Sequence, residues 1–454
     1  MVFSALTADF CPFVQKSIND AAGRARLHYN AVKPFIVSAM PSVTVDRLQP
    51  GIFISLSHIG WIRHPFLLNE FRLSSEKQIR ALQEMGLKEV EWHPERSTAL
   101  PLPVATSHEA EEGEMDFGAS ALAGMLDEKK QRIDRVRRQR ENLARREREY
   151  NEELAAVSDI LKRVGADAPE AHSHAQSLAA HVVAGLMGAE SVAIQLVNQK
   201  ARESGLAFHS LNVMVLSMLL GKTIGLSAEE MRYLGVGTLL HDVGKTEIPV
   251  RILRAASRTP PEEEFYRAHV GYGIKAVAKA KGMAVPARNI IACHHERWDG
   301  SGFPNRLQGD KIPRLARIAA IADRYDNLCN PFDIKDAKTP SEALGHMFKN
   351  EGQWFDPELL QLFIKTLGIY PPGTFVMLSN GTIGLVIETD PARLLHPLVM
   401  LYDPEVPRNE ALMLDLKEAD LSVEQAVNPA TLPLEAVEYL APRGRIDYCV
   451  EGAP

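Results

Sequence analysis

The sequence is poor in cysteine and lacks the close cysteine pairs from which small metal sites are built. Its 454 residues include only four cysteines, Cys11, Cys293, Cys329 and Cys449, and no two of them have CxxC spacing. Widely separated cysteines are typical of reduced thiols in a cytosolic protein. We therefore expect neither a disulfide framework nor a cysteine-based zinc site.

The sequence also lacks a secretory signal, a membrane-spanning run and an excess of positive charge. The first residues, MVFSALTADFCPF, have no basic region followed by an apolar core. The most apolar stretch, residues 178–197, is interrupted by His181, Glu190 and Gln195. Lys and Arg number 51 against 58 Asp and Glu, which gives a net charge of -7. We expect a cytoplasmic protein with no membrane span and no nucleic-acid partner.

Length and composition predict a folded protein of several domains. Hydrophobic residues make up 45% and charged residues 24% of the chain, which excludes overall disorder. We expect a mainly α protein, divided into an N-terminal α+β module (1–93, core 44–93), a linker (94–124), a long charged helix (125–165), a helical domain (166–369) and a β-rich C-terminal segment (370–454).

Caps and turns support this division. The stretches Ser227–Glu230 and Thr259–Glu262 have the spacing of capping boxes, so each predicts the start of a helix. Asn380-Gly381 joins two runs of alternating hydrophobicity, which predicts a β-hairpin. The chain thus changes from helical to β-rich character after about residue 370.

The long charged helix at residues 126–161 has two interpretations. Its apolar residues follow two heptad positions, one holding Ile133, Leu154 and Leu161 and the other Val136, Leu143, Tyr150 and Val157. Arg140 and Glu147 interrupt the first position, which weakens the seam. The pattern fits either a coiled-coil homodimer or a solvated helix that packs on its own domain.

Potential metal ligands are spread over the helical region. The set consists of His209, His241, Asp242, His269, His294, His295 and Asp323. Each residue taken singly is more often structural, but a mixed imidazole and carboxylate set of this size suits two ions of iron, manganese or zinc. Two such ions can hold a hydroxide and clamp a phosphodiester for in-line attack. Lys245, three residues after Asp242, would supply a cation for the phosphate.

Local patterns indicate that several of these side chains point inward. His241 and Asp242 lie about two turns after Leu234 on the helix that starts near Ser227. Asp323 follows a run of alanines and isoleucines, which is typical of a tightly packed helix face. A buried carboxylate needs a metal, a cationic partner or hydrogen bonds.

The segments HDVGK, HHERWDGSGFP and ADRYDNL resemble the HD-GYP phosphodiesterases, a branch of the HD superfamily. The likeness covers roughly residues 200–370, and the long HHE…DGxG(Y/F)P signature is highly specific. The segment GWIRHPFL resembles the small domain of unknown function often fused ahead of HD-GYP domains. The resemblance implies an all-helical catalytic domain of bacterial second-messenger signalling, which hydrolyses cyclic di-GMP to pGpG and often on to GMP through a metal-bridged hydroxide.

Residue roles follow from the resemblance by position. It makes the seven candidate residues metal ligands, with Asp242 as the bridging catalytic carboxylate and Lys245 as a contact of the scissile phosphate. It implies iron most strongly and manganese next. Diguanylate cyclases are candidate partners. The further substrate contacts we expect are Gly302, Phe303, Pro304, Asp326 and Lys335.

Three departures from the family pattern qualify these expectations. Phe303 keeps the ring of the usual Tyr but loses its hydroxyl. Gly205 stands where trinuclear members carry Glu, so we predict two metal ions and no third. Phe332 stands where a phosphate-gripping Arg is usual, and Lys335 alone matches a basic position. The alternatives are a nucleotide sensor or interaction scaffold of low activity, and a phosphodiesterase for another cyclic dinucleotide.

Overall fold

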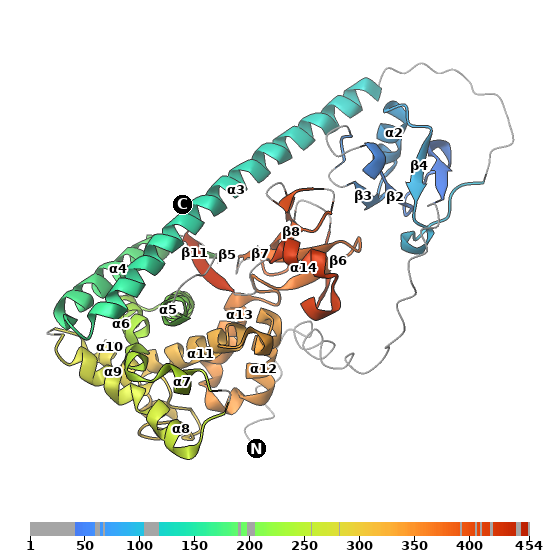
Figure 1. Ribbon diagram of the computed structural model, residues 1–454. Coiled ribbons are helices and arrows are strands. Elements are labelled where there is room, and N and C mark those ends of the chain that lie inside the picture. Colours follow the sequence, from blue (N-terminus) through green and yellow to red (C-terminus); the bar gives the residue numbers. More distant parts are fainter. Residues whose placement is uncertain are drawn as a thin grey trace. The chain divides into compact units, whose positions relative to one another are not determined.

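The structure is a computed structural model in which the described residues form two compact units (Figure 1). The larger unit comprises described parts of 142–378 and 382–454, and the smaller one described parts of 25–141 and 379–381. The described residues are 41–59, 64–66, 69–103, 118–188, 192–197, 205–255, 257–280, 282–390, 393–404, 406–408, 411–417, 421–441 and 446–452.

The smaller unit contains the predicted α+β module. Four antiparallel strands, β1 (Ser42–Thr44), β2 (Phe53–Ser55), β3 (Glu70–Arg72) and β4 (Glu89–Trp92), lie in the order β1-β4-β2-β3, with helix α2 (Glu76–Glu84) after β3. Ile52, Ile54 and Leu56 alternate in sequence, as predicted, and are fully buried. Together with Leu82 of α2 and Val90 of β4 they form the core of this module.

The long charged helix is α3 (Gly118–Arg163), which begins earlier than the predicted residue 125. Part of the expected linker is therefore helical, while residues 104–117 of it lie outside the described residues. Tyr150, Val157 and Leu161 are at most 6% exposed and join the core of the larger unit. This part of α3 packs on its own chain, so those heptad positions are not free to form an intermolecular seam.

Helices make up most of the larger unit. They are α4 (Ala168–Gly188), α5 (Gly205–Thr223), α6 (Ala228–Leu240), α7 (Val250–Leu253), α8 (Pro260–Arg267), α9 (His269–Val277), α10 (Val285–Cys293), α11 (Arg314–Cys329), α12 (Pro340–Asn350) and α13 (Pro357–Leu367). The capping boxes predicted at Ser227 and Thr259 are both formed and start α6 and α8. Helix α5 is long and apolar enough to cross a membrane, but 78% of the apolar stretch is buried, as in a core helix.

The C-terminal segment builds an antiparallel sheet. Its strands are β6 (Phe375–Leu378), β7 (Ile383–Thr389), β8 (Leu398–Leu401), β9 (Met413–Asp415), β10 (Val423–Ala426) and β11 (Asp447–Gly452), and helix α14 (Leu434–Leu440) lies between the last two. Strands β6 and β7 form the hairpin predicted around Asn380-Gly381, where Gly381 has a φ of 82°. The predicted fold class, mainly α with a small α+β N-terminal module and a small β-rich C-terminal segment, is confirmed.

One strand of this sheet comes from the region expected to be entirely helical. β5 (Val192–Val197) lies between β7 and β11 in the order β10-β6-β7-β5-β11, with β8 beside β7 and β9. It pairs with β11 along its whole length. The expectation of an all-helical catalytic region was therefore wrong for residues 192–197. These residues form a strand by pairing with β7 and β11, which are distant in the sequence, and a short apolar run does not by itself distinguish a strand from a helix.

Candidate metal centre

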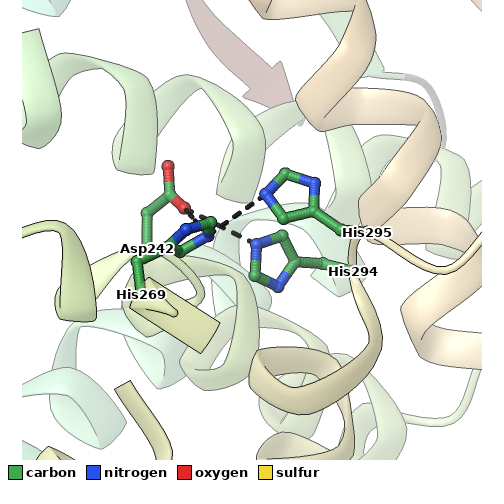
Figure 2. A group of neighbouring side chains, drawn as sticks. All are labelled: Asp242, His269, His294 and His295. Atoms are coloured by element: carbon green, nitrogen blue, oxygen red, sulfur yellow. Dashed lines mark hydrogen bonds and ion pairs between the residues drawn. The ribbon is translucent and has the colours of Figure 1, made fainter. Parts of the chain in front are cut away.

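All seven predicted ligand residues meet inside the larger unit. They come from five places along the chain: His209 from α5, His241 and Asp242 from the end of α6, His269 from the start of α9, His294 and His295 from the end of α10, and Asp323 from α11. They form two groups, and within each group the ligand atoms lie within 4.8 Å of one another. Asp242 belongs to both groups. The first also contains His209, His241 and Asp323, and the second His269, His294 and His295. Figure 2 shows the second group, in which the imidazoles of His269, His294 and His295 lie beside the Asp242 carboxylate.

The two oxygens of Asp242 face different histidines. Oδ2 lies 3.4 Å from Nε2 of both His209 and His241. Oδ1 lies 3.4 Å from Nε2 of His269 and 3.5 Å from Nε2 of His294. A carboxylate with one oxygen in each group has the geometry required to bridge two ions.

Asp323 gives the first group a second carboxylate. Its Oδ1 lies 3.0 Å from Nε2 of His209 and 3.7 Å from Nε2 of His241. Its Oδ2 lies 3.9 Å from Nδ1 of His295, a member of the second group. The side chain is buried, as the alanine-rich face of α11 predicts.

Backbone hydrogen bonds orient the buried imidazoles. In three of them Nδ1 donates to the carbonyl three residues earlier: His241 to Thr238 at 2.6 Å, His269 to Tyr266 at 2.6 Å and His294 to Ile291 at 3.1 Å. A proton held on Nδ1 leaves the Nε2 lone pair available, and this nitrogen faces the carboxylates.

The local chemistry fits divalent cations. Asp242 Oδ1 and His294 Nε2 are buried and have no hydrogen-bond partner among the described residues. Nε2 of His209 lies 3.2 Å from Nε2 of His241, a close approach of two potential lone pairs. Unpaired buried polar atoms are costly, and metal ions between these nitrogens and oxygens would satisfy them.

The charges around Asp242 set the protonation states of the centre. Burial would raise the pKa of this carboxyl, but Lys245 and the neighbouring histidines outweigh burial and hold the pKa well below its ordinary value. Burial lowers the pKa of His269 to about 4, so this imidazole is neutral at pH 7. Burial also lowers the pKa of His294 and His295. The second group thus presents an anionic carboxylate and neutral imidazoles, which are the forms that bind metal.

Gly244 allows the segment carrying Lys245 to approach α9 closely. A Cβ at position 244 would lie 1.9 Å from the carbonyl oxygen of His269 and 2.4 Å from the nitrogen of Gly273. A larger residue would separate the two segments. The glycine of HDVGK is therefore explained by packing beside a candidate ligand.

The glycine-rich loop after α10 folds back over the centre. Phe303 donates its backbone N–H to the His295 carbonyl at 3.1 Å, and its ring stacks on the His295 imidazole. Buried Glu296 accepts backbone N–H groups of Asn305 at 2.7 Å and Leu307 at 2.8 Å, which fixes the loop. Gly302, Phe303 and Pro304 thus lie beside the centre, where their predicted contact with substrate is geometrically reasonable.

The remaining predicted substrate contacts have different surroundings. Lys335 is exposed, and Phe332 is 61% exposed with the Arg254 guanidinium 5.1 Å from its ring centroid. Asp326 is 1% exposed, and its carboxylate is bonded to His209 and two asparagines. A direct contact of Asp326 with substrate does not fit this burial.

Several residues that support the centre were missed from the sequence. Asn327 donates to Asp323 Oδ1 at 2.7 Å, and its position four residues after Asp323 on one helix was a usable signal. Asn212, Asn330 and Glu296 also hold side chains or loops of the centre. No local pattern distinguishes these residues from ordinary polar residues.

Two protein families match the chain. Residues 190–359 match the HD domain, and residues 42–174 match the domain of unknown function DUF3391. The cyclic di-GMP phosphodiesterase PA4108 of Pseudomonas aeruginosa is 29% identical over 79% of this chain and 84% of its own length. The 3'3'-cGAMP-specific phosphodiesterase 2 of Vibrio cholerae is 36% identical over 37% of this chain and 32% of its own.

A third relative matches over a similar part of the chain. The cyclic di-GMP phosphodiesterase response regulator RpfG of Xanthomonas campestris is 34% identical over 32% of this chain and 39% of its own length. The chain thus spans about a third of the second and third relatives. Fold, site and matches together define an HD-domain protein whose His and Asp clusters could hold divalent metal ions. Within that class, the two domain matches and the relatives named as cyclic di-GMP phosphodiesterases support the HD-GYP family, with a DUF3391 domain at residues 42–174.

Proposed function

We propose that the protein is a metal-dependent phosphodiesterase that hydrolyses cyclic di-GMP. The single observation that carries the proposal is the position of Asp242, with one oxygen in each of two candidate metal groups. The names of two relatives, PA4108 and RpfG, support the substrate. Hydrolysis would yield pGpG, GMP or both.

The seven residues of the two groups would hold two divalent ions. Such ions supply a nucleophile at neutral pH and neutralise the charge that develops on a phosphate. The imidazole and carboxylate ligands, without thiolate, suit iron, manganese or zinc. The resemblance to the HD-GYP phosphodiesterases makes iron the metal we favour, with manganese next. Gly205, the first residue of α5, offers no carboxylate for a third ion.

The protein's own side chains would bind and orient the phosphodiester. Lys245 pairs with Asp242 and lies at the centre's edge, so its ammonium would hold a phosphate oxygen. Phe303, stacked on His295, would limit water access and shape the pocket beside the metal ligands. Lys335 would add a more distant cation.

A turnover experiment tests the proposal. The protein is purified without oxygen, loaded with iron or manganese, checked for metal content, and incubated with cyclic di-GMP while products are separated by chromatography. We expect pGpG or GMP to accumulate with at least one metal. Absence of product from protein that contains two ions per chain would contradict the enzyme proposal.

A second candidate substrate is 3'3'-cGAMP. One relative is named as specific for it, and Phe332 stands where we expected a phosphate-gripping Arg. A parallel assay of cyclic di-GMP and 3'3'-cGAMP at equal concentrations separates the candidates by their kcat/KM ratio. Binding of cyclic di-GMP by His241→Ala or Asp242→Ala protein, with no turnover by the wild type, would favour the sensor alternative instead.

The long helix α3 bears on possible protein partners. A homodimer through residues 126–161 would have to use positions before Tyr150, since Val157 and Leu161 are buried in the chain's own core and Leu154 packs against that core. Diguanylate cyclases remain candidate partners of such a scaffold. Sedimentation of the whole chain measures the oligomeric state directly.

A further inference from the structure

A buried hydrogen-bond network lies behind His209, on the ring nitrogen opposite the candidate metal group. His209 Nδ1 donates to Asp326 Oδ2 at 2.7 Å. The other oxygen of Asp326 accepts from Asn212 Nδ2 at 2.8 Å and from Asn330 Nδ2 at 2.9 Å. Asp326 and Asn212 are each 1% exposed. The orientation of the His209 ring thus depends on a carboxylate that two asparagines hold.

The same two asparagines bind the backbone at the start of the last strand. Nδ2 of Asn212 and of Asn330 donate to the Ile446 carbonyl at 3.1 Å and 2.7 Å. The Ile446 N–H donates to Asn330 Oδ1 at 2.8 Å, and the Tyr448 N–H donates to Asn212 Oδ1 at 3.2 Å. The side-chain amide oxygens of Asn212 and Asn330 therefore accept backbone N–H groups of the strand. This orients the side-chain amide nitrogen of each asparagine so that it can donate to Asp326.

The strand that supplies these groups is itself firmly held. β11 pairs with β5 in register from Asp447↔Val197 to Gly452↔Val192. Tyr448 is fully buried, and its hydroxyl lies 3.0 Å from that of Tyr325 on α11. The backbone at Ile446–Tyr448 is therefore a fixed support for the two asparagines.

We propose that residues 446–448, acting through Asn212 and Asn330, hold Asp326 so that His209 presents Nε2 to the first metal group. Asp326, Asn212 and Asn330 are positioning residues in this arrangement. The inference rests on the proposed function as a metal centre. Residues 446–448 and their strand lie outside the 190–359 match to the HD domain, so part of the centre's support comes from the C-terminal segment.

The network should act on one ion only. His209 belongs to the group with His241, Asp242 and Asp323, whereas the second group contains no residue bonded to Asp326 among those described. The outer hydrogen bonds of His269 and His294 go to backbone carbonyls instead. Loss of an outer partner of a ligating histidine typically weakens metal binding by about 10- to 100-fold.

Two variants test the inference by metal binding. Asp326→Asn removes the negative charge behind His209. Asn330→Ser removes one of the two asparagine links between Asp326 and Ile446. Metal-free protein is titrated with Mn²⁺ by calorimetry, and the loaded protein is examined by electron paramagnetic resonance. We expect two binding steps in the wild type, and in both variants one unchanged step and one weakened by roughly 10-fold or more. The signal of a coupled manganese pair should decrease in favour of a single ion.

The control is Tyr325→Phe, which removes the hydroxyl contact between α11 and the same strand but leaves the asparagine network intact. We expect a lower melting temperature and two normal binding steps. If Asp326→Asn and Asn330→Ser weaken both metal-binding steps equally, or change neither, this inference is overturned and the proposed function is not affected. A wild-type protein that binds no metal contradicts the proposed function as well.

Discussion

The ring of Phe303 stacks on the imidazole of His295, with 4.7 Å between the ring centroids and 29° between their planes. The Arg267 guanidinium lies over the same Phe303 ring, 4.9 Å from its centroid. The ring alone makes these contacts, so replacement of the family's usual Tyr by Phe preserves the packing at this position. The hydroxyl is lost without disturbing the candidate ligand.

The loop that positions Phe303 should not tolerate a side chain at Gly302. In Gly302→Ala a Cβ would lie 2.3 Å from the Arg297 nitrogen and 2.5 Å from the His295 carbonyl oxygen, so backbone must move. We expect a loss of about 1–3 kcal/mol in the free energy of unfolding, together with lower kcat/KM. The control is Gly345→Ala on α12, where a Cβ meets no atom within 4 Å. Chemical denaturation should show this control to be as stable as the wild type or more so.

Asp242→Asn should remove both ions, because this carboxylate serves both groups. His209→Gln and His294→Gln each alter one group, so we expect each to weaken mainly one ion. Elemental analysis after dialysis should give fewer ions in Asp242→Asn than in either histidine variant. Turnover by Asp242→Asn should fall by a factor of 100 or more, equivalent to about 2.7 kcal/mol in transition-state free energy. Retention of two ions in Asp242→Asn would refute the bridging geometry.

Lys245→Met should weaken substrate use more than metal binding. Burial alone would lower the pKa of Lys245, but attraction from Asp242, Tyr266 and Asp323 raises it above the ordinary value of about 10.4. A raised pKa keeps the ammonium charged at every pH below that value, so Lys245 should add no pH dependence to KM between pH 6 and 9. We expect kcat/KM to fall roughly 10- to 100-fold on loss of a charge-assisted phosphate contact. Loss of metal with unchanged KM would assign Lys245 to stabilising Asp242 instead.

Cys293 should resist thiol reagents in the folded protein. Burial, with a smaller contribution from Glu296, raises the pKa of the Cys293 thiol to about 11. The reactive thiolate is formed only as pH rises toward that value, so alkylation at pH 8 should be slow. Peptide mapping after iodoacetamide treatment measures this directly, with denatured protein as the fully labelled control. Rapid labelling of native Cys293 at pH 8 would show that the end of α10 opens readily.

Local patterns in the sequence were sufficient for the helix starts and for the burial of His241 and Asp242. Ser227 and Thr259 form their capping boxes because the hydrogen bonds involved span only three residues. His241 and Asp242 follow Leu234 at helical spacing and are fully buried. These features depend on neighbours in the chain, which a single sequence displays.

Features built from distant segments could not be read in the same way. β5 is a strand because β7 and β11 pair with it, and nothing in residues 192–197 specifies those partners. Asp326 lies at helical spacing from Asp323, but spacing alone could not show that asparagines and His209 occupy its oxygens. Burial of Tyr150 and Val157 likewise depends on the domain that α3 contacts, so periodicity left two interpretations open.

The contact between Asn212 and Ile446 joins residues separated by 234 positions in the chain. During synthesis, α5 therefore leaves the ribosome long before the backbone that completes its hydrogen bonds exists. Contacts of such high sequence separation form late and slowly. The helices around the centre can assemble first, but His209 acquires its final support only after residues 446–448 have been translated.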